Sequence, residues 1–199
     1  MNTFGIRVRG LVVALAAVAL TATACTASKD AVDPVPNSEF RFTDATDKGS
    51  VIPVADREKP GDVSGELLDG NGTYTLGQDA GKVVVVNLWG SWCGPCQVET
   101  PQFEQVYLDT KAEGVEFVGF AIKDDRSKAQ AFVEDNQITY PMVFDQATKV
   151  ALQLGGLKVQ AGMPQTVIVD KQGRVAASYV GIVKPTDLKA AIVTLVAES

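Results

Sequence analysis

Apolar residues follow one another without alternation from Val83 to Leu88, with Asn87 as the one polar member. Such a run is typical of a strand that is buried on both faces of a parallel sheet. A second apolar stretch, Val115 to Ile122, predicts another strand. Between them we expect a helix from about Cys93 to Ala112. This strand–helix–strand order predicts a parallel pair at the centre of the fold.

Shorter segments on either side of this unit complete the pattern. The turn residues of Asp69-Gly70-Asn71-Gly72 predict a hairpin over Glu66–Tyr74. A last helix opens at Pro185 and buries an apolar stripe. The other elements we expect are a helix from Ser127, as its N-cap, to about Asn136, a strand over Pro141–Phe144, a helix over Thr148–Leu154, and a hairpin of Thr166–Val169 and Val175–Val180. Together they predict an α/β domain, a mixed sheet with helices on both faces, over residues 60–199.

The strongest candidate for chemistry is Trp92-Cys93-Gly94-Pro95-Cys96, just after the first strand. Two cysteines three residues apart close a small disulfide ring and open it again without large backbone movement. At the start of a helix, unpaired N–H groups and the helix dipole favour the thiolate of Cys93. The thiolate is the species that attacks a disulfide. Pro95 suits a first helical turn, where its missing N–H needs no partner.

The cysteine count narrows the alternatives. The chain has three cysteines and no histidine. A structural zinc site needs four Cys or His ligands, so zinc is disfavoured and we expect no metal and no cofactor. The absence of histidine also excludes Cys–His and Ser–His–Asp catalysis. A purely structural disulfide stays open, although a loop this small constrains the unfolded chain little.

Residues 1–24 have the layout of a secretory signal. Basic residues precede an uncharged run from Leu11 to Leu20, and Ala22-Thr23-Ala24 stands before Cys25. A basic start, a short apolar centre and small residues before the cut define such signals. A cysteine directly after the small residues resembles the lipobox of bacterial lipoproteins, so we expect lipid attachment at Cys25. Ordinary cleavage and an uncleaved membrane anchor are the alternatives.

The segment 25–59 is polar, contains several prolines and has no clear period, which predicts a flexible linker between the lipid anchor and the domain. An extension that packs on the domain through Phe40, Phe42, Val51 and Ile52 is the alternative. The net charge is −6, and no basic patch indicates nucleic-acid binding. The acidity favours a soluble, monomeric domain.

The dithiol and four other segments follow one another along the chain in a characteristic order. They are Gly81–Trp89, Trp92–Cys96, Glu99–Pro101, Gly162–Asp170 and Gly173–Val175. This set resembles the thioredoxin superfamily, and more narrowly the membrane-tethered thiol–disulfide oxidoreductases of the TlpA, ResA and CcmG type. The resemblance covers roughly Lys59 to Val196. It implies a thioredoxin-like fold in which Val115–Leu154 holds an inserted helix and strand.

The resemblance also implies roles for individual residues. Cys93 matches the exposed attacking thiol, and Cys96 matches the buried resolving thiol. Pro164 matches a cis-proline that faces the dithiol and leaves the preceding backbone free to pair with a substrate strand. The positions that contact the substrate correspond to Trp92, Gly94, Pro95 and Met163.

Asn87 and Glu99 mark a departure from thioredoxin itself. Thioredoxins have a buried aspartate six residues before the attacking cysteine, where this chain has Asn87. The tethered family commonly has a glutamate three residues after the second cysteine, and Glu99 matches it. Residues three apart on a helix are neighbours, so Glu99 lies near Cys96. Two interpretations stay open: Glu99 accepts the proton of the buried thiol, or it only complements the helix dipole.

The resemblance implies an extracytoplasmic enzyme, lipid-anchored in the cell membrane. Most members of this family reduce disulfides of exported proteins, often apocytochrome c, with electrons from a membrane thiol donor. A dithiol oxidase or isomerase would use the same residues, so the direction of electron flow stays open. A non-catalytic lipoprotein adaptor is the alternative of another class. Both cysteines, both tryptophans and Pro164 disfavour it.

Overall fold

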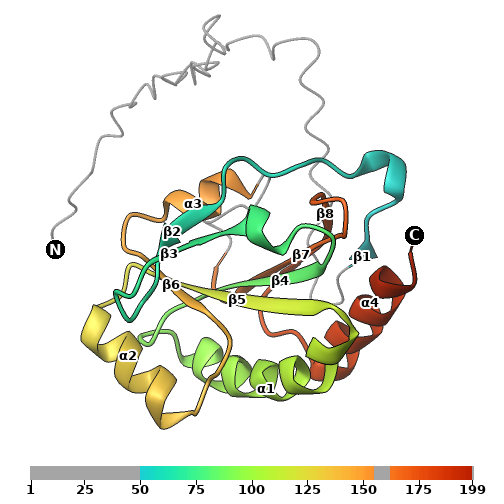
Figure 1. The fold of residues 1–199 in the computed structure, drawn as a ribbon. Coiled ribbons are helices and arrows are strands. Elements are labelled where there is room, and N and C mark those ends of the chain that lie inside the picture. Colours follow the sequence, from blue (N-terminus) through green and yellow to red (C-terminus); the bar gives the residue numbers. More distant parts are fainter. Residues whose placement is uncertain (1–49, 155–161, 199) are drawn as a thin grey trace, which may run out of the picture. The chain divides into compact units, whose positions relative to one another are not determined.

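A six-stranded mixed sheet forms the centre of the domain in this computed structural model, which describes residues 50–154 and 162–198 (Figure 1). The strand order is β1-β8-β7-β4-β5-β6. Strand β4 pairs in parallel with β5, and β5 with β6, whereas β7, β8 and β1 join antiparallel. The strands of this sheet are β1 (Ser50–Val51), β4 (Val83–Trp89), β5 (Val115–Ile122), β6 (Met142–Asp145), β7 (Gln165–Val169) and β8 (Val175–Val180). The predicted α/β class with a mixed sheet is confirmed.

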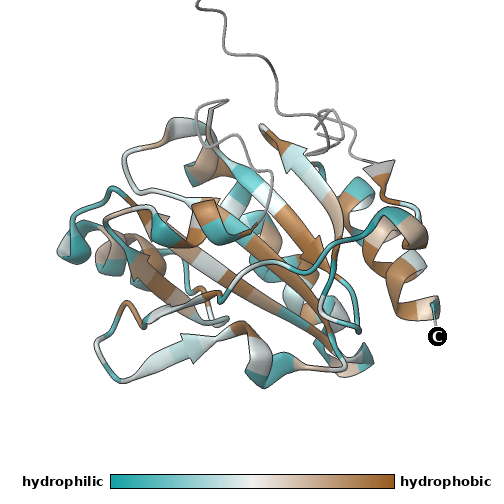
Figure 2. Cartoon of the chain, turned by 90° about the horizontal axis from the view of Figure 1, so that it is seen from above, coloured by the Kyte–Doolittle hydropathy of each residue, from teal (hydrophilic) through white to brown (hydrophobic). Residues whose placement is uncertain are grey.

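Strand β4 is buried along its whole length, as its apolar run predicts. Successive side chains of a strand point to opposite faces, so β4 supplies two cores. Val83, Val85 and Trp89 belong to one core, and Val84, Val86 and Leu88 belong to the other. Seen from above in Figure 2, the central strands are mostly brown, the hydrophobic colour, and the connecting loops are largely teal. Asn87 therefore occupies a core-facing position in the row of Trp89.

Helices cover the two faces of the sheet unequally (Figure 1). Helices α1 (Gly94–Thr110), α2 (Arg126–Asp135) and α4 (Pro185–Ala197) pack on the face that includes Trp89. Helix α3 (Lys149–Gln153) and the hairpin of β2 (Ser64–Glu66) and β3 (Thr73–Thr75) lie over the other face, where Tyr74 and Leu154 are buried. Short 3-10 turns complete the chain: η1 (Val54–Asp56), η2 (Leu76–Asp79) and η3 (Lys111–Glu113).

The predicted elements are found, with one wrong N-cap. Asp125, not Ser127, caps α2: its carboxylate accepts hydrogen bonds from the backbone N–H groups of Ser127 and Lys128. An aspartate placed one residue before the helix satisfies two donors that have no partner within the helix. Ser127 lies inside the first turn, and its hydroxyl donates to Asp125 instead. The helix and strand of the predicted insert are α2 and β6.

The end of the predicted linker belongs to the domain, which corrects its boundary at residue 59. Strand β1 pairs with β8, and Ile52 is buried. Arg57 is buried as well, and its guanidinium pairs with Asp170 at 3.1 Å and with Glu198 at 2.5 Å. A buried arginine with two acidic partners is not a feature of a polar linker. For residues 50–59 the alternative of an extension that packs on the domain therefore holds, through Val51 and Ile52. Residues 25–49 of the predicted linker, like the predicted signal, lie outside the described residues.

None of the helices within residues 50–154 and 162–198 has the length and apolar character needed to cross a membrane.

Candidate active site

The dithiol lies where β4 ends and α1 begins. Cys93 is the N-cap of α1, and its backbone is extended, with φ −96° and ψ 105°. Its sulfur accepts a hydrogen bond from the N–H of Cys96 at 3.3 Å. Pro95 occupies the first turn, as expected for a residue without an N–H group. The two cysteines form a disulfide, with an S–S distance of 2.06 Å.

The two sulfurs differ in access. Cys93 keeps 5% of its surface exposed, whereas Cys96 is fully buried. Cys93 is thus more enclosed than the predicted exposed thiol, but it is the one of the pair that solvent and a partner reach. Its place at the helix N-terminus favours a negative charge on its sulfur once the disulfide is reduced.

On α1, three residues after Cys96, a buried carboxylate joins three parts of the domain. Glu99 is fully buried on α1. Its two oxygens accept hydrogen bonds from the side-chain amide of Asn87 on β4, at 3.0 Å, and from the N–H of Val183, at 2.8 Å. Val183 lies in the loop between β8 and α4. Asn87 also donates to the hydroxyl of Thr166 on β7, at 3.3 Å. Glu99 is therefore shielded from solvent and held by donors from β4 and from the β8–α4 loop.

The environment of Glu99 changes its acidity. Burial raises the pKa of Glu99 from 4.5 to about 7, and the hydrogen bonds from Val183 and Asn87 offset part of that rise. A carboxyl group with a pKa near the working pH both takes and returns a proton. Glu99 follows Cys96 by three residues on the same helix, which places their β-carbons roughly 5–6 Å apart. The arrangement thus places a carboxyl group with a pKa of about 7 near the buried thiol.

Three of the predicted substrate-contacting residues are sequence neighbours of Cys93 and Cys96. Trp92 is 55% exposed, and Gly94 and Pro95 are exposed beside it. Met163 is half-buried and packs against the core cluster that contains both cysteines. The peptide bond between Met163 and Pro164 is cis, as the resemblance implied. Cys25, the predicted lipid-attachment site, lies outside the described residues.

Sequence reasoning missed two residues near the dithiol. Val183 supplies a backbone donor to Glu99, and no sequence pattern marks a backbone contact of this kind. Asp124 accepts hydrogen bonds from the backbone and the hydroxyl of Ser91, just before the dithiol. A signal for Asp124 was present, because it follows the carboxyl end of β5. Polar residues at the carboxyl ends of parallel strands often belong to sites.

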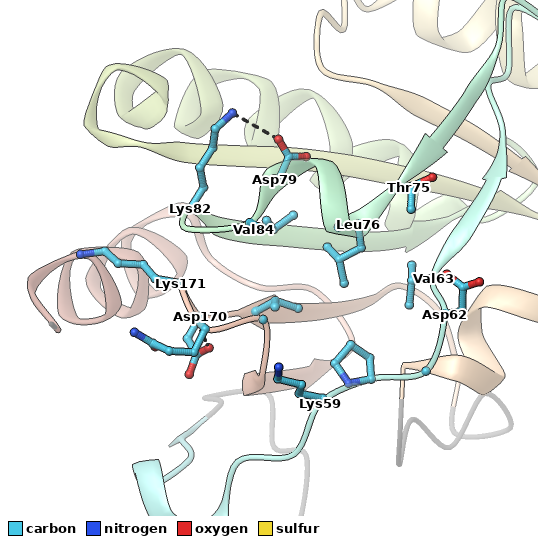
Figure 3. A pocket seen from close by; sticks show the side chains of 17 residues that line it. Lys59, Asp62, Val63, Thr75, Leu76, Asp79, Lys82, Val84, Asp170 and Lys171 are labelled. Carbon is cyan, nitrogen blue, oxygen red and sulfur yellow. Dashed lines mark hydrogen bonds and ion pairs between the residues drawn. The ribbon is translucent and has the colours of Figure 1, made fainter.

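A hollow of about 360 Å³ lies at the amino end of β4, away from the dithiol, and includes none of the predicted site residues (Figure 3). Val63, Leu76 and Val84 line its apolar part. Two of the lysines at its edge are engaged: Lys82 pairs with Asp79 and Glu116, and the ammonium of Lys171 donates to two carbonyls at the end of α4. Lys59, also at the edge, is exposed. A second hollow, of about 420 Å³, lies between the β2–β3 hairpin and α2.

Comparison with known proteins gives the family of this chain. A family model described as Redoxin matches residues 33–192, which include the dithiol, Glu99 and Pro164. The chain belongs to the Redoxin family. Among solved structures, a secreted thiol-disulfide isomerase from Corynebacterium glutamicum is similar, with a TM-score of 0.72 and 31% identity. The match covers 76% of this chain and 93% of that protein. The fold is thioredoxin-like, as the resemblance implied.

Two curated relatives are also similar over part of their length. The thiol-disulfide oxidoreductase ResA of Geobacillus thermodenitrificans is 30% identical over 109 residues, which are 55% of this Redoxin chain and 60% of ResA. The thiol:disulfide interchange protein HelX of Rhodobacter capsulatus is 35% identical over 102 residues, which are 51% of this chain and 53% of HelX. The chain thus spans between half and two thirds of the length of these relatives.

Proposed function

We propose that this Redoxin-family protein is a thiol–disulfide oxidoreductase whose dithiol is Cys93 and Cys96. The observation that carries the proposal is the placement of the two cysteines. Cys93 caps α1 and keeps some exposure, while Cys96 is enclosed behind it. A partly accessible thiol at a helix N-terminus with a second thiol three residues on is the arrangement that disulfide exchange requires.

The exchange proceeds in two steps when the protein acts as a reductant. The thiolate of Cys93 attacks one sulfur of the substrate disulfide, that S–S bond breaks, and the other substrate sulfur leaves as a thiolate. Cys96, deprotonated, then attacks the sulfur of Cys93 and releases the second substrate sulfur. The protein ends with the Cys93–Cys96 disulfide, and the substrate gains two electrons and two protons. An oxidase runs the same steps in reverse.

Glu99 serves as the proton acceptor for Cys96 in the second step. Three features support this role: it is buried, it is three residues from Cys96 on α1, and its pKa is about 7. Glu99→Gln keeps the shape and removes the titrating group. We expect resolution of the mixed disulfide to slow by at least tenfold, since general acid–base catalysis typically contributes about 100- to 10,000-fold, and to lose its pH dependence near pH 7. Superimposable pH profiles for both proteins would remove Glu99 from the mechanism.

We assign the substrate contacts to Trp92, Gly94, Pro95 and Met163. Trp92, Gly94 and Pro95 present exposed surface beside Cys93, and Met163 packs against the dithiol cluster. Pro164 is assigned to the site through the family resemblance. The aromatic face of Trp92 suits a substrate peptide, because aromatic rings contribute large contact areas at interfaces.

Reduction of exported proteins is the direction we infer, with oxidised apocytochrome c as a candidate substrate and a membrane thiol carrier as electron donor. The resemblance to ResA-type and CcmG-type proteins supports it. Oxidation or isomerisation of secreted proteins is the second candidate, favoured by the similarity to the secreted isomerase of Corynebacterium glutamicum. Equilibration with glutathione separates them. A reductant resembles thioredoxin at about −270 mV, and an oxidant approaches DsbA at about −120 mV.

An extracytoplasmic position follows from the same reasoning. We propose that residues 1–24 direct export and that Cys25 carries a lipid, which holds the domain at the outer face of the cell membrane as a monomer. The small residues before Cys25 support lipid attachment. The test is Cys25→Ala in cells: the protein should leave the membrane fraction or remain unprocessed. A variant that is processed and equally membrane-bound would refute lipid attachment at Cys25.

A further inference from the structure

A tight turn leads from β4 into the dithiol. The N–H of Cys93 donates to the carbonyl of Gly90 at 3.0 Å, which closes a four-residue turn with Ser91 and Trp92 at its centre. The indole of Trp92 folds over Gly90, because a β-carbon on Gly90 would approach its Nε1 to 2.6 Å. The conformation of this turn fixes where the sulfur of Cys93 lies.

Asp124, two residues after the end of β5, contacts this turn through its side chain. It is 4% exposed, and its carboxylate accepts hydrogen bonds from the N–H of Ser91 at 2.5 Å and from the hydroxyl of Ser91 at 2.7 Å. The next residue of the turn is tied to the same segment, since the indole of Trp92 donates to the carbonyl of Ile122 at 3.2 Å. Two consecutive turn residues are thus joined to the end of β5.

The negative charge of Asp124 has no cation beside it. No ion pair within residues 50–154 and 162–198 includes Asp124. Lys123 is exposed, and the guanidinium of Arg126 is engaged with Glu66 and with the carbonyls of Leu67 and Leu68. The carboxylate of Asp125 is exposed and caps α2.

This charge lies close to the reactive sulfur. Consecutive α-carbons are about 3.8 Å apart, so Ser91 and Cys93 are separated by at most about 7.6 Å, and the turn shortens that distance. The carboxylate contacts Ser91 directly, which places it within about 10 Å of Cys93. A poorly hydrated negative charge at this distance opposes the formation of a second negative charge on the sulfur.

We propose that Asp124 is a positioning residue that holds the Gly90–Cys93 turn and, through its charge, disfavours the Cys93 thiolate, so that the dithiol becomes a stronger reductant. The inference rests on the proposed thiol–disulfide exchange. A thiolate that is less stabilised makes the reduced protein less stable relative to the disulfide. Asp124 thereby opposes the helix dipole, which stabilises the thiolate.

The experiment equilibrates the purified protein with reduced and oxidised glutathione. Asp124→Asn keeps an acceptor for the Ser91 N–H and removes the charge. We expect its equilibrium to shift about threefold to tenfold toward the dithiol, equivalent to about 15–30 mV at 29.6 mV per tenfold change. Ionisation of Cys93, followed by thiolate absorbance, should begin at lower pH than in the wild type. Asp125→Asn, with the same change of charge at the exposed neighbour, should shift the equilibrium by less than about twofold, as expected for a screened charge.

The outcomes separate the inference from the function on which it rests. An unchanged equilibrium in Asp124→Asn, or a shift toward the disulfide, overturns the role of Asp124 while leaving the exchange itself intact. A wild-type protein that does not exchange with glutathione overturns both. Asp124→Ala tests the positioning, because it also removes the acceptor for Ser91. Its exchange with glutathione should be slower than that of Asp124→Asn, and equal rates would refute the positioning role.

Discussion

Asn87 on β4 donates its side-chain amide to the buried carboxylate of Glu99 on α1, over 3.0 Å. An asparagine in the middle of an apolar strand is explained by this contact. Asn87 faces the same core as Trp89. A charged Glu99 carboxylate without hydrogen-bond donors would be strongly disfavoured in that core. The amide lowers the pKa of Glu99 against the larger effect of burial. Asn87 and Glu99 therefore act as one unit, in which the strand residue controls the charge of the helix residue.

Replacing Asn87 with alanine should raise the pKa of Glu99 above 7. The carboxylate loses one of its two donors, and a hydrogen bond to a charged group contributes about 1.5–3 kcal/mol, or about one to two pKa units. The measurement is the pH dependence of the Glu99 carboxyl signal by carbon NMR, with Asn71→Ala, an exposed hairpin substitution, as the control. A Glu99 titration that is unchanged in Asn87→Ala would contradict the coupling.

The raised pKa of Glu99 predicts how stability depends on pH. The folded protein binds the proton of the Glu99 carboxyl group more tightly than the unfolded chain does. The contribution of this proton to the free energy of unfolding is therefore complete below about pH 4.5. It declines as the pH rises and is lost above about pH 7, where deprotonation of Glu99 costs roughly 3 kcal/mol. Relative to Glu99→Gln, the wild-type protein should therefore lose stability between pH 4.5 and pH 7.

Denaturant unfolding of the disulfide form at several pH values makes this comparison directly. The difference in unfolding free energy between wild type and Glu99→Gln should change with pH over that interval. A constant difference would show that Glu99 titrates at its ordinary pKa in the folded protein.

Local patterns predicted most of the fold. The continuous apolar residues of β4 and β5 and the turn residues around Gly70 and Gly173 act over a few positions, so a single sequence displays them. The contacts that the sequence did not reveal join distant residues. Arg57 pairs with Asp170 and Glu198, more than a hundred positions away, so no local pattern marks it as part of the domain.

In the candidate site, too, local features were predicted from the sequence and long-range contacts were not. The spacing of Cys93 and Cys96 indicated a dithiol at a helix start, and the family resemblance added Glu99 and Pro164. The burial of Glu99 was not predictable, because it depends on the loop that brings the N–H of Val183 to its carboxylate. The contact between Asp124 and Ser91 likewise forms only when β5 lies beside β4.

Arg57→Ala should destabilise the domain by about 3–5 kcal/mol, the usual effect of removing one partner of a buried ion pair. The substitution leaves the buried carboxylate of Asp170 with Arg174 as its remaining ion-pair partner in the described structure, and it releases the end of α4 at Glu198. Thermal or denaturant unfolding measures the loss. Lys59→Ala, at an exposed position two residues on, is the control and should change stability by less than about 0.5 kcal/mol. Equal effects of the two substitutions would contradict the assignment of residues 50–59 to the domain.

Gly119→Ala should destabilise the protein by about 1–3 kcal/mol through overpacking. A β-carbon at this position on β5 would overlap the sulfur of Met142 and approach the indole nitrogen of Trp89 to 2.9 Å. Gly77→Ala is the matched control, because nothing lies within 4 Å of a β-carbon there. Unfolding by denaturant compares the two variants. A Gly119→Ala protein as stable as Gly77→Ala would show that the packing around Trp89 adjusts freely.

The proposed exchange is tested most directly by trapping the mixed disulfide. Cys96→Ser retains the attacking thiol and removes the resolving thiol, so it should accumulate a covalent complex with a disulfide-bonded peptide through Cys93, released by reductant. Cys93→Ser leaves the buried Cys96 as the only thiol of the pair and should trap at least about tenfold less at this site, since access limits thiol exchange. Peptide mapping by mass spectrometry identifies the linked cysteine. Linkage through Cys96, or equal trapping by both variants, would contradict the assignment of Cys93 as the attacking residue.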